Sequence, residues 1–120
     1  MVGRSDLYMF FGKVVLDGVG TSGKEGENVL NIGTDRAKGC IFEARFPGLE
    51  GSGNIEVKVQ HSDDGTSFTD LVTTGSKAVS DVKGTLLEVA IGSHKKYLRM
   101  FVIPSASLTG EVRGELNTKR

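Results

Sequence analysis

The chain has 120 residues, of which 38% are apolar and 25% are charged, which is typical of one globular domain and unlike a disordered chain. Its 15 basic and 15 acidic residues cancel, so the sequence lacks the basic surplus that would favour nucleic acid as a partner. No apolar run approaches the roughly 20 residues that span a bilayer, and we expect neither a membrane span nor a secretion signal.

Apolar and polar residues alternate along most of the chain, which predicts strands, and nothing sustains the periodicity of an amphipathic helix. In chain order the predicted strands are 7–11, 13–16, 29–32, 40–46, 55–61, 67–72, 85–91, 97–103 and 111–116, and the pattern is weakest in the first three and in 67–72. Many of the 17 glycines lie between these segments, where turns are expected. Strands spaced at about 8 to 12 residues predict an all-β sandwich or barrel.

Few residues could carry chemistry, and structural roles suit them better. Cys40 is the sole cysteine, so the chain alone forms no disulfide or thiolate metal cluster. It alternates with Phe42 and Ala44 on an apolar strand face, which predicts a buried small hydrophobe. His61 and His94 are too few for a three-histidine zinc site within one chain, although symmetry could gather one histidine from each of several subunits.

The segment around Asp63, Asp64 and Gly65 predicts a hairpin turn, because an aspartate-glycine pair suits the backbone of a tight turn. A triad built from His61 and its neighbours is disfavoured, since adjacent strand residues point to opposite faces. A calcium loop that starts at Asp63 fails at its third and twelfth positions. Residues 48–53 lack the lysine of a phosphate loop. We therefore expect no enzymatic activity, cofactor or metal.

The predicted strand 97–103 is apolar on both faces, although the outer face of a sandwich strand normally meets water. Tyr97, Phe101 and Ile103 lie on its second face together with Arg99. We expect another subunit to cover this face, with the apolar residues in the contact and Arg99 at its polar rim. A covering loop is the alternative.

The N-terminal region shows a similar two-sided pattern, which predicts an arm that reaches a neighbouring molecule. The alternative is a strand buried within its own domain. The residues assigned to this arm are Leu7, Tyr8, Phe10 and Phe11.

The segment VKVQHSDDGTSFTDL, at 57–71, and the segment KKYLR, at 95–99, resemble the small capsid decoration, or cement, proteins of tailed bacteriophages. The shared pattern is a V-x-V-Q-x-S-x-D-G-x-x-F hairpin and a later K/R-Y-L-R strand, and the resemblance covers about residues 37–117. It implies a jelly-roll sandwich that forms homotrimers and binds the major capsid protein on the outside of the shell. Such a protein would be made in the host cytoplasm and located on the virion.

The same residues are also similar to discoidin-type carbohydrate- or lipid-binding modules, which pair an S-x-D-G-x-x-W/F-T hairpin with an R-Y-V/L-R strand. Those modules carry a framing pair of cysteines and aromatic binding loops, whereas this chain has one cysteine and no tryptophan. A phage tail or adhesion component is a further alternative. We expect a structural virion protein and no small-molecule ligand.

The predicted fold is thus an antiparallel, jelly-roll-like β-sandwich of about eight strands in one domain. Residues 1–36 are expected to form an N-terminal arm and the first strands, and residues 37–117 the core of the sandwich.

Overall fold

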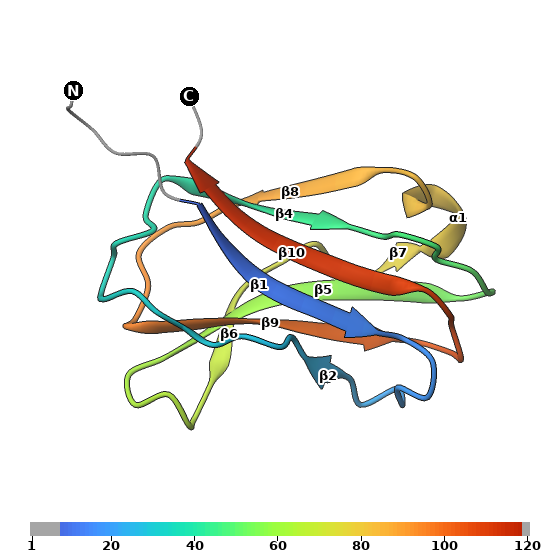
Figure 1. Ribbon diagram of the computed structural model, residues 1–120, viewed down its shortest axis with the longest axis horizontal. Helices are drawn as coiled ribbons and strands as arrows, with labels where there is room; N and C mark the ends of the chain where they lie inside the picture. Colours follow the sequence, from blue (N-terminus) through green and yellow to red (C-terminus); the bar gives the residue numbers. More distant parts are fainter. Residues whose placement is uncertain (1–7, 119–120) are drawn as a thin grey trace.

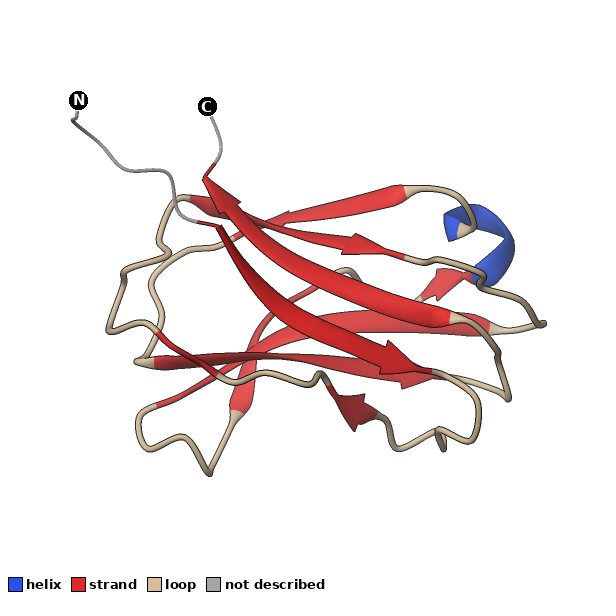
Figure 2. Ribbon diagram, in the orientation of Figure 1, coloured by secondary structure: helices blue, strands red, loops and turns tan. Residues whose placement is uncertain are grey.

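The structure is a computed structural model that describes residues 8–118, and nearly all of its regular elements are strands (Figure 1, Figure 2). These elements are β1 (Tyr8–Val15), β2 (Lys24–Glu25), β3 (Leu30–Asn31), β4 (Cys40–Arg45), β5 (Asn54–Ser62), β6 (Thr69–Thr73), β7 (Lys77–Ala78), α1 (Val79–Val82), β8 (Leu86–Ala90), β9 (Tyr97–Pro104) and β10 (Glu111–Thr118). The single-turn helix α1 lies at one end of the molecule (Figure 2).

The strands form two antiparallel sheets. In the first sheet the order is β1-β10-β4-β8. The centre of the second sheet is the pair of β9 and β5. Both β2 and β3 pair with the free side of β9, and both β6 and β7 pair with the free side of β5. The pairs β2 with β3 and β6 with β7 each act as one interrupted edge strand, so the ten strands occupy eight positions. This order is that of a jelly roll, and the predicted all-β sandwich is confirmed.

The core lies between the sheets and is built from the inward residues of alternating strands. Phe11 and Phe42 meet edge to face, with ring centroids 5.5 Å apart. Gly114 makes room for Phe42 and for Met100 of the opposite sheet, because a Cβ at this position would touch the sulfur of Met100 and lie 2.9 Å from the Phe42 ring. The first sheet can therefore approach the second closely at this glycine.

The five strongest predicted strands appear within one or two residues of their expected limits, as β4, β5, β8, β9 and β10. The weak predictions at 7–11 and 13–16 are one strand, β1, in which the register shifts between Phe10 and Gly12. This β-bulge interrupts the alternation and makes one strand look like two. Alternation gave no sign of β2 and β7, since two residues are too few to show it.

The sandwich core extends further toward the N-terminus than residue 37. β1 pairs with β10, while β2 and β3 pair with β9, so residues before 37 belong to both sheets. They contribute buried side chains to the core, namely Phe11, Val14, Leu16, Leu30 and Ile32. Within the described residues, the expected division at residue 36 is not a boundary between an arm and a core.

Candidate interaction surface

The outer face of the second sheet carries the residues that the sequence assigned to an interface. Along β9 every second residue is buried, and Tyr97, Arg99, Phe101 and Ile103 point outward and are partly exposed. Below, these four residues together with Phe68 are called the aromatic stripe. It crosses the middle of the sheet, because β9 is paired on both sides.

Arg99 lies between two aromatic rings. Its guanidinium carbon is 4.2 Å from the centroid of the Phe68 ring and 5.5 Å from that of Phe101. Its Nε donates a 2.8 Å hydrogen bond to Oε1 of Gln60, the residue opposite it on β5. The arginine is thus held at the centre of the stripe by stacking and by a fixed hydrogen bond, not at its polar margin.

A polar network continues from Arg99 across β5 to β6. The amide nitrogen of Gln60 donates to Oδ1 of Asp70 at 3.0 Å, and Lys58 Nζ donates to Oδ2 at 2.7 Å. The hydrogen bond from Lys58 holds the pKa of Asp70 below its ordinary value, and the same bond raises the pKa of Lys58. Four side chains on three strands are therefore fixed relative to one another.

The hairpin between β5 and β6 positions Phe68 beside Arg99. The Asp64 carboxylate accepts hydrogen bonds from the backbone N–H groups of Ser67 and Thr66 and from the hydroxyl of Ser62, all within 3.0 Å. These donors hold the pKa of Asp64 far below its usual range. Gly65 has a φ of 80° and packs under the ring of Tyr97. The predicted hairpin turn is present.

The remaining member of the predicted turn, Asp63, is exposed. Its carboxylate lies 3.8 Å from Lys95 Nζ, in an ion pair that water screens. The turn therefore depends on Asp64, Ser62 and Gly65, and Asp63 contributes little to it.

The two histidines have structural roles that the sequence did not reveal. His94 is buried, its Nε2 accepts a 2.8 Å hydrogen bond from the Ala37 N–H, and its Nδ1 lies 2.6 Å from the Lys95 carbonyl. This pattern fits a neutral ring with its proton on Nδ1. His61 accepts from the Lys95 N–H at 3.1 Å, and burial lowers its pKa. Together they fasten the loop at 92–96 to its neighbours.

No signal in the sequence joins His94 to Ala37, because they lie on different loops and touch only once the sheets are formed. The described residues contain no group of three or more His, Cys, Asp or Glu side chains placed to hold a metal ion. Cys40 is a free, buried thiol, as its alternation predicted.

The residues of the predicted N-terminal arm lie in different environments. Leu7 lies outside the described residues, and Tyr8 begins β1. Phe10 is 36% exposed on the outer face of the first sheet, whereas Phe11 is fully buried. The assignment of Phe11 to a contact arm is wrong, because Phe11 points to the face opposite Phe10 and its ring packs on Phe42 in the core. The alternative, a strand buried in its own domain, describes β1 better.

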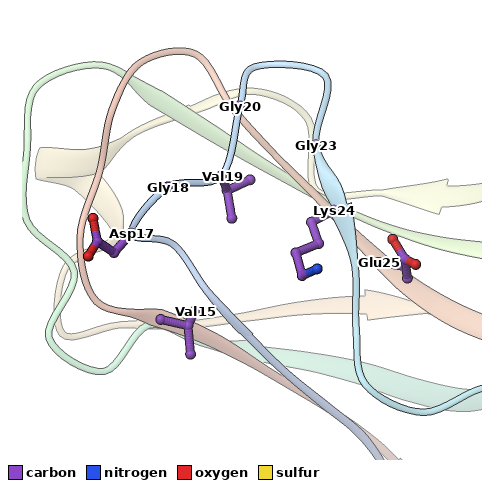
Figure 3. Close-up of a pocket in the computed structure, with 8 residues that line it drawn as sticks. All are labelled: Val15, Asp17, Gly18, Val19, Gly20, Gly23, Lys24 and Glu25. Carbon is purple, nitrogen blue, oxygen red and sulfur yellow. The ribbon is translucent and has the colours of Figure 1, made fainter.

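An open hollow of about 390 Å³ lies at the loop between β1 and β2. Figure 3 shows the residues that line it: Val15, Val19 and Lys24 lie in the middle of the view, with Asp17 on one side, Glu25 on the other and several glycines along the loop. No aromatic side chain lines the hollow, so it lacks the flat apolar surface on which a sugar ring stacks. It contains none of the residues that the sequence singled out.

The protein is a jelly-roll β-sandwich by its strand order. No protein-family model matches the chain, and no curated protein matches it. Among solved structures, one of Bacillus endospore appendages, described as a family of disulfide-linked pili, is 15% identical to it. The alignment covers 97% of this chain and 91% of that chain with a TM-score of 0.40, a likeness that carries no argument about function. In the described part of the chain, no helix has the length and apolar character needed to cross a bilayer.

Proposed function

We propose that this protein is a structural assembly protein that forms a homotrimer through the aromatic stripe and binds the outside of a phage capsid to stabilise it. The observation that carries the proposal is the position of Arg99, stacked between Phe68 and Phe101 in the middle of an outer sheet face. Arginine and aromatic residues are the side chains most enriched at the centres of protein interfaces.

The fixed conformations of the side chains in and beside the aromatic stripe support its role as a contact surface. Arg99 is fixed by Gln60, and Gln60 is fixed by Asp70, so these side chains lose little conformational freedom when a partner covers them. Preorganised side chains lower the entropic cost of association. Phe101 and Ile103 supply apolar area that a partner can remove from water.

The phage assignment is supported by the residues that carry the resemblance. The segments 57–71 and 95–99 contain the whole hairpin with Phe68, and also Tyr97 and Arg99, so the residues that resemble cement proteins include part of this surface, while Phe101 and Ile103 follow on β9. The jelly roll itself is an architecture that viral capsid proteins use widely. A trimer could spread weak contacts over several capsid subunits, which together hold the shell.

The first test is the solution mass of the protein by light scattering coupled to size exclusion. A trimer has three times the 12.8 kDa mass of the chain. The substitution Phe101→Asp should give a folded monomer, because it places a charge in the contact. Ser80→Asp is the control for the added charge, since Ser80 is exposed on α1 at one end of the molecule and outside the aromatic stripe, and this variant should remain trimeric.

The second test is co-sedimentation with undecorated phage capsids, which the wild-type chain should bind and Phe101→Asp should bind more weakly. A wild-type monomer, or a trimer that Phe101→Asp leaves intact, contradicts the assignment of the stripe. A monomer that binds sugars in a glycan panel would favour the discoidin-like alternative instead.

A further inference from the structure

The outer face of the first sheet carries charges of the same sign in rows across neighbouring strands. One row, called the basic row, consists of directly opposed residues on β1, β10 and β4, namely Lys13, Arg113 and Arg45. Two residues further along the strands lies the acidic row, on β10, β4 and β8, namely Glu115, Glu43 and Glu88. Directly opposed residues have Cβ atoms about 4.5 to 5.5 Å apart, so the rows are continuous stripes of charge.

Within one chain this pattern is unfavourable, because like charges directly opposite each other destabilise a sheet. Glu111 relieves part of the basic row through ion pairs of 2.6 Å with Arg113 and 3.9 Å with Lys13. Arg45 lies 4.0 Å from Glu43, near the limit of an ion pair. Charges of alternating sign across the strands would have stabilised the same sheet more, and two parallel rows of opposite sign give this face a pattern that is complementary to itself.

Exposed apolar residues gather on the same face. The described residues include four large hydrophobic side chains that are well exposed, and three of them, Phe10, Val15 and Leu86, lie on β1 and β8 at the two edges of this sheet. They flank the charged rows on both sides. A face with apolar margins and ordered charges has the composition of an interface rather than of a purely solvated surface.

We propose that this face docks a second copy of the chain, related by a two-fold axis that runs between the two rows and parallel to them. A half turn about this axis brings the two sheets face to face and lays the basic row over the partner's acidic row on β10 and β4, while at the margins Lys13 faces the partner's Phe10 and Glu88 faces the partner's Leu86. Arg113 then faces the partner's Glu115, and Arg45 faces the partner's Glu43. A two-fold contact requires such a self-complementary surface, and each pair occurs twice.

The docking face and the aromatic stripe lie on opposite sides of the sandwich, so this contact is independent of the proposed trimer. A protein that uses both contacts would form an assembly larger than a trimer, which is a hexamer where the two axes meet at right angles, and a protein that uses one would form a dimer or a trimer. The solution mass therefore separates the two proposals.

The test is a set of charge reversals read by sedimentation at low ionic strength, where screening is weak. Arg113→Glu and Glu115→Arg each place like charges in contact, and each should weaken the two-fold association by at least about tenfold. An equimolar mixture of the two variants should associate again, because the Glu at 113 of one then faces the Arg at 115 of the other. The double variant should also associate, since it reverses both charges together.

Lys38→Glu is the control for net charge, because Lys38 is an exposed loop residue outside both surfaces, and it should leave the association unchanged. Circular dichroism establishes that each variant is folded, which is expected for substitutions on an outer face. Recovery in the mixture cannot arise from a folding defect, since each variant would keep its own defect there.

Several outcomes overturn the proposal. If the single variants associate as well as the wild type, or the mixture stays apart, the docking face is wrong. A threefold wild-type mass that Arg113→Glu does not change would refute the two-fold contact and leave the trimer standing. A twofold wild-type mass that falls with Arg113→Glu but not with Phe101→Asp would support the two-fold contact and refute the trimer. A monomeric chain whose capsid binding is lost in Arg113→Glu would assign this face to the capsid.

Discussion

Replacement of Phe11 by alanine tests whether β1 is part of the core or a contact arm. Phe11 is fully buried and packs edge to face on Phe42. Truncation of a buried phenylalanine to alanine costs about 3 to 5 kcal/mol, which includes the cavity that it leaves. A domain of this size has a total stability of about 5 to 15 kcal/mol, so the loss should be a large fraction of it.

The assay is urea unfolding followed by circular dichroism, together with thermal unfolding. At about 3 to 6 °C per kcal/mol for a domain of this length, Phe11→Ala should lower Tm by roughly 10 to 25 °C. Phe10→Ala is the matched control on the same strand, and its cost should stay under about 1 kcal/mol because the Phe10 side chain is 36% exposed.

Equal losses in the two variants, or a loss under about 1 kcal/mol for Phe11→Ala, would refute the placement of Phe11 in the core. A second readout is the solution mass below Tm. Folded Phe11→Ala should keep the wild-type mass, whereas a residue of a contact arm would change it.

Three further substitutions test local features. Gly110→Ala should lower the free energy of unfolding in urea by about 2 kcal/mol or more, because the φ of Gly110 is 96° and a Cβ would press on the backbone of Gly48. Gly92→Ala is the control and should cost little, because a Cβ at Gly92 would lie in open space. His94→Ala should lower the free energy of unfolding by about 2 to 4 kcal/mol and speed hydrogen exchange at the Ala37 amide, because this amide loses its buried acceptor. An unchanged exchange rate would contradict the role of His94. The pKa of Asp64 is lower in the folded chain than the unfolded value of about 3.9, so its contribution is complete above about pH 4 and is lost as the pH falls further. Asp64→Asn removes this titration, and its urea midpoint should fall less steeply than that of the wild type between about pH 4 and pH 2.

Alternation predicted the central strands well because each has one face in the core. In β5, Ile55, Val57 and Val59 are buried while the residues between them are not, so the period of two is plain in the sequence. The same logic found the two-sided character of β9, and the structure places Tyr97, Phe101 and Ile103 together on the outer face.

Features that depend on register or on irregular backbone could not be predicted. The bulge in β1 places Phe11 and Gly12 both on the buried side, and a pattern of alternation has no means of showing an inserted residue. The charged rows exist only because β10 pairs with β4 at a particular register, which places Arg113 beside Arg45, 68 positions apart. Single positions such as these look like ordinary solvated charges in the sequence.

The place of β10 in the first sheet also has a consequence for how the chain folds. Among the described strands β10 comes last along the chain, yet it lies in the interior of the sheet, paired with β1 on one side and β4 on the other (Figure 1). Until β10 is synthesised, β1 has no neighbour in the first sheet and β4 lacks one of its two. Folding must then close loops that span nearly the whole chain, which places this topology among the slower two-state folders, on a timescale of roughly milliseconds to seconds. A nascent chain that lacks β10 would leave two strand edges open to other chains, so the emergence of β10 is the step that closes these edges and protects the domain from aggregation.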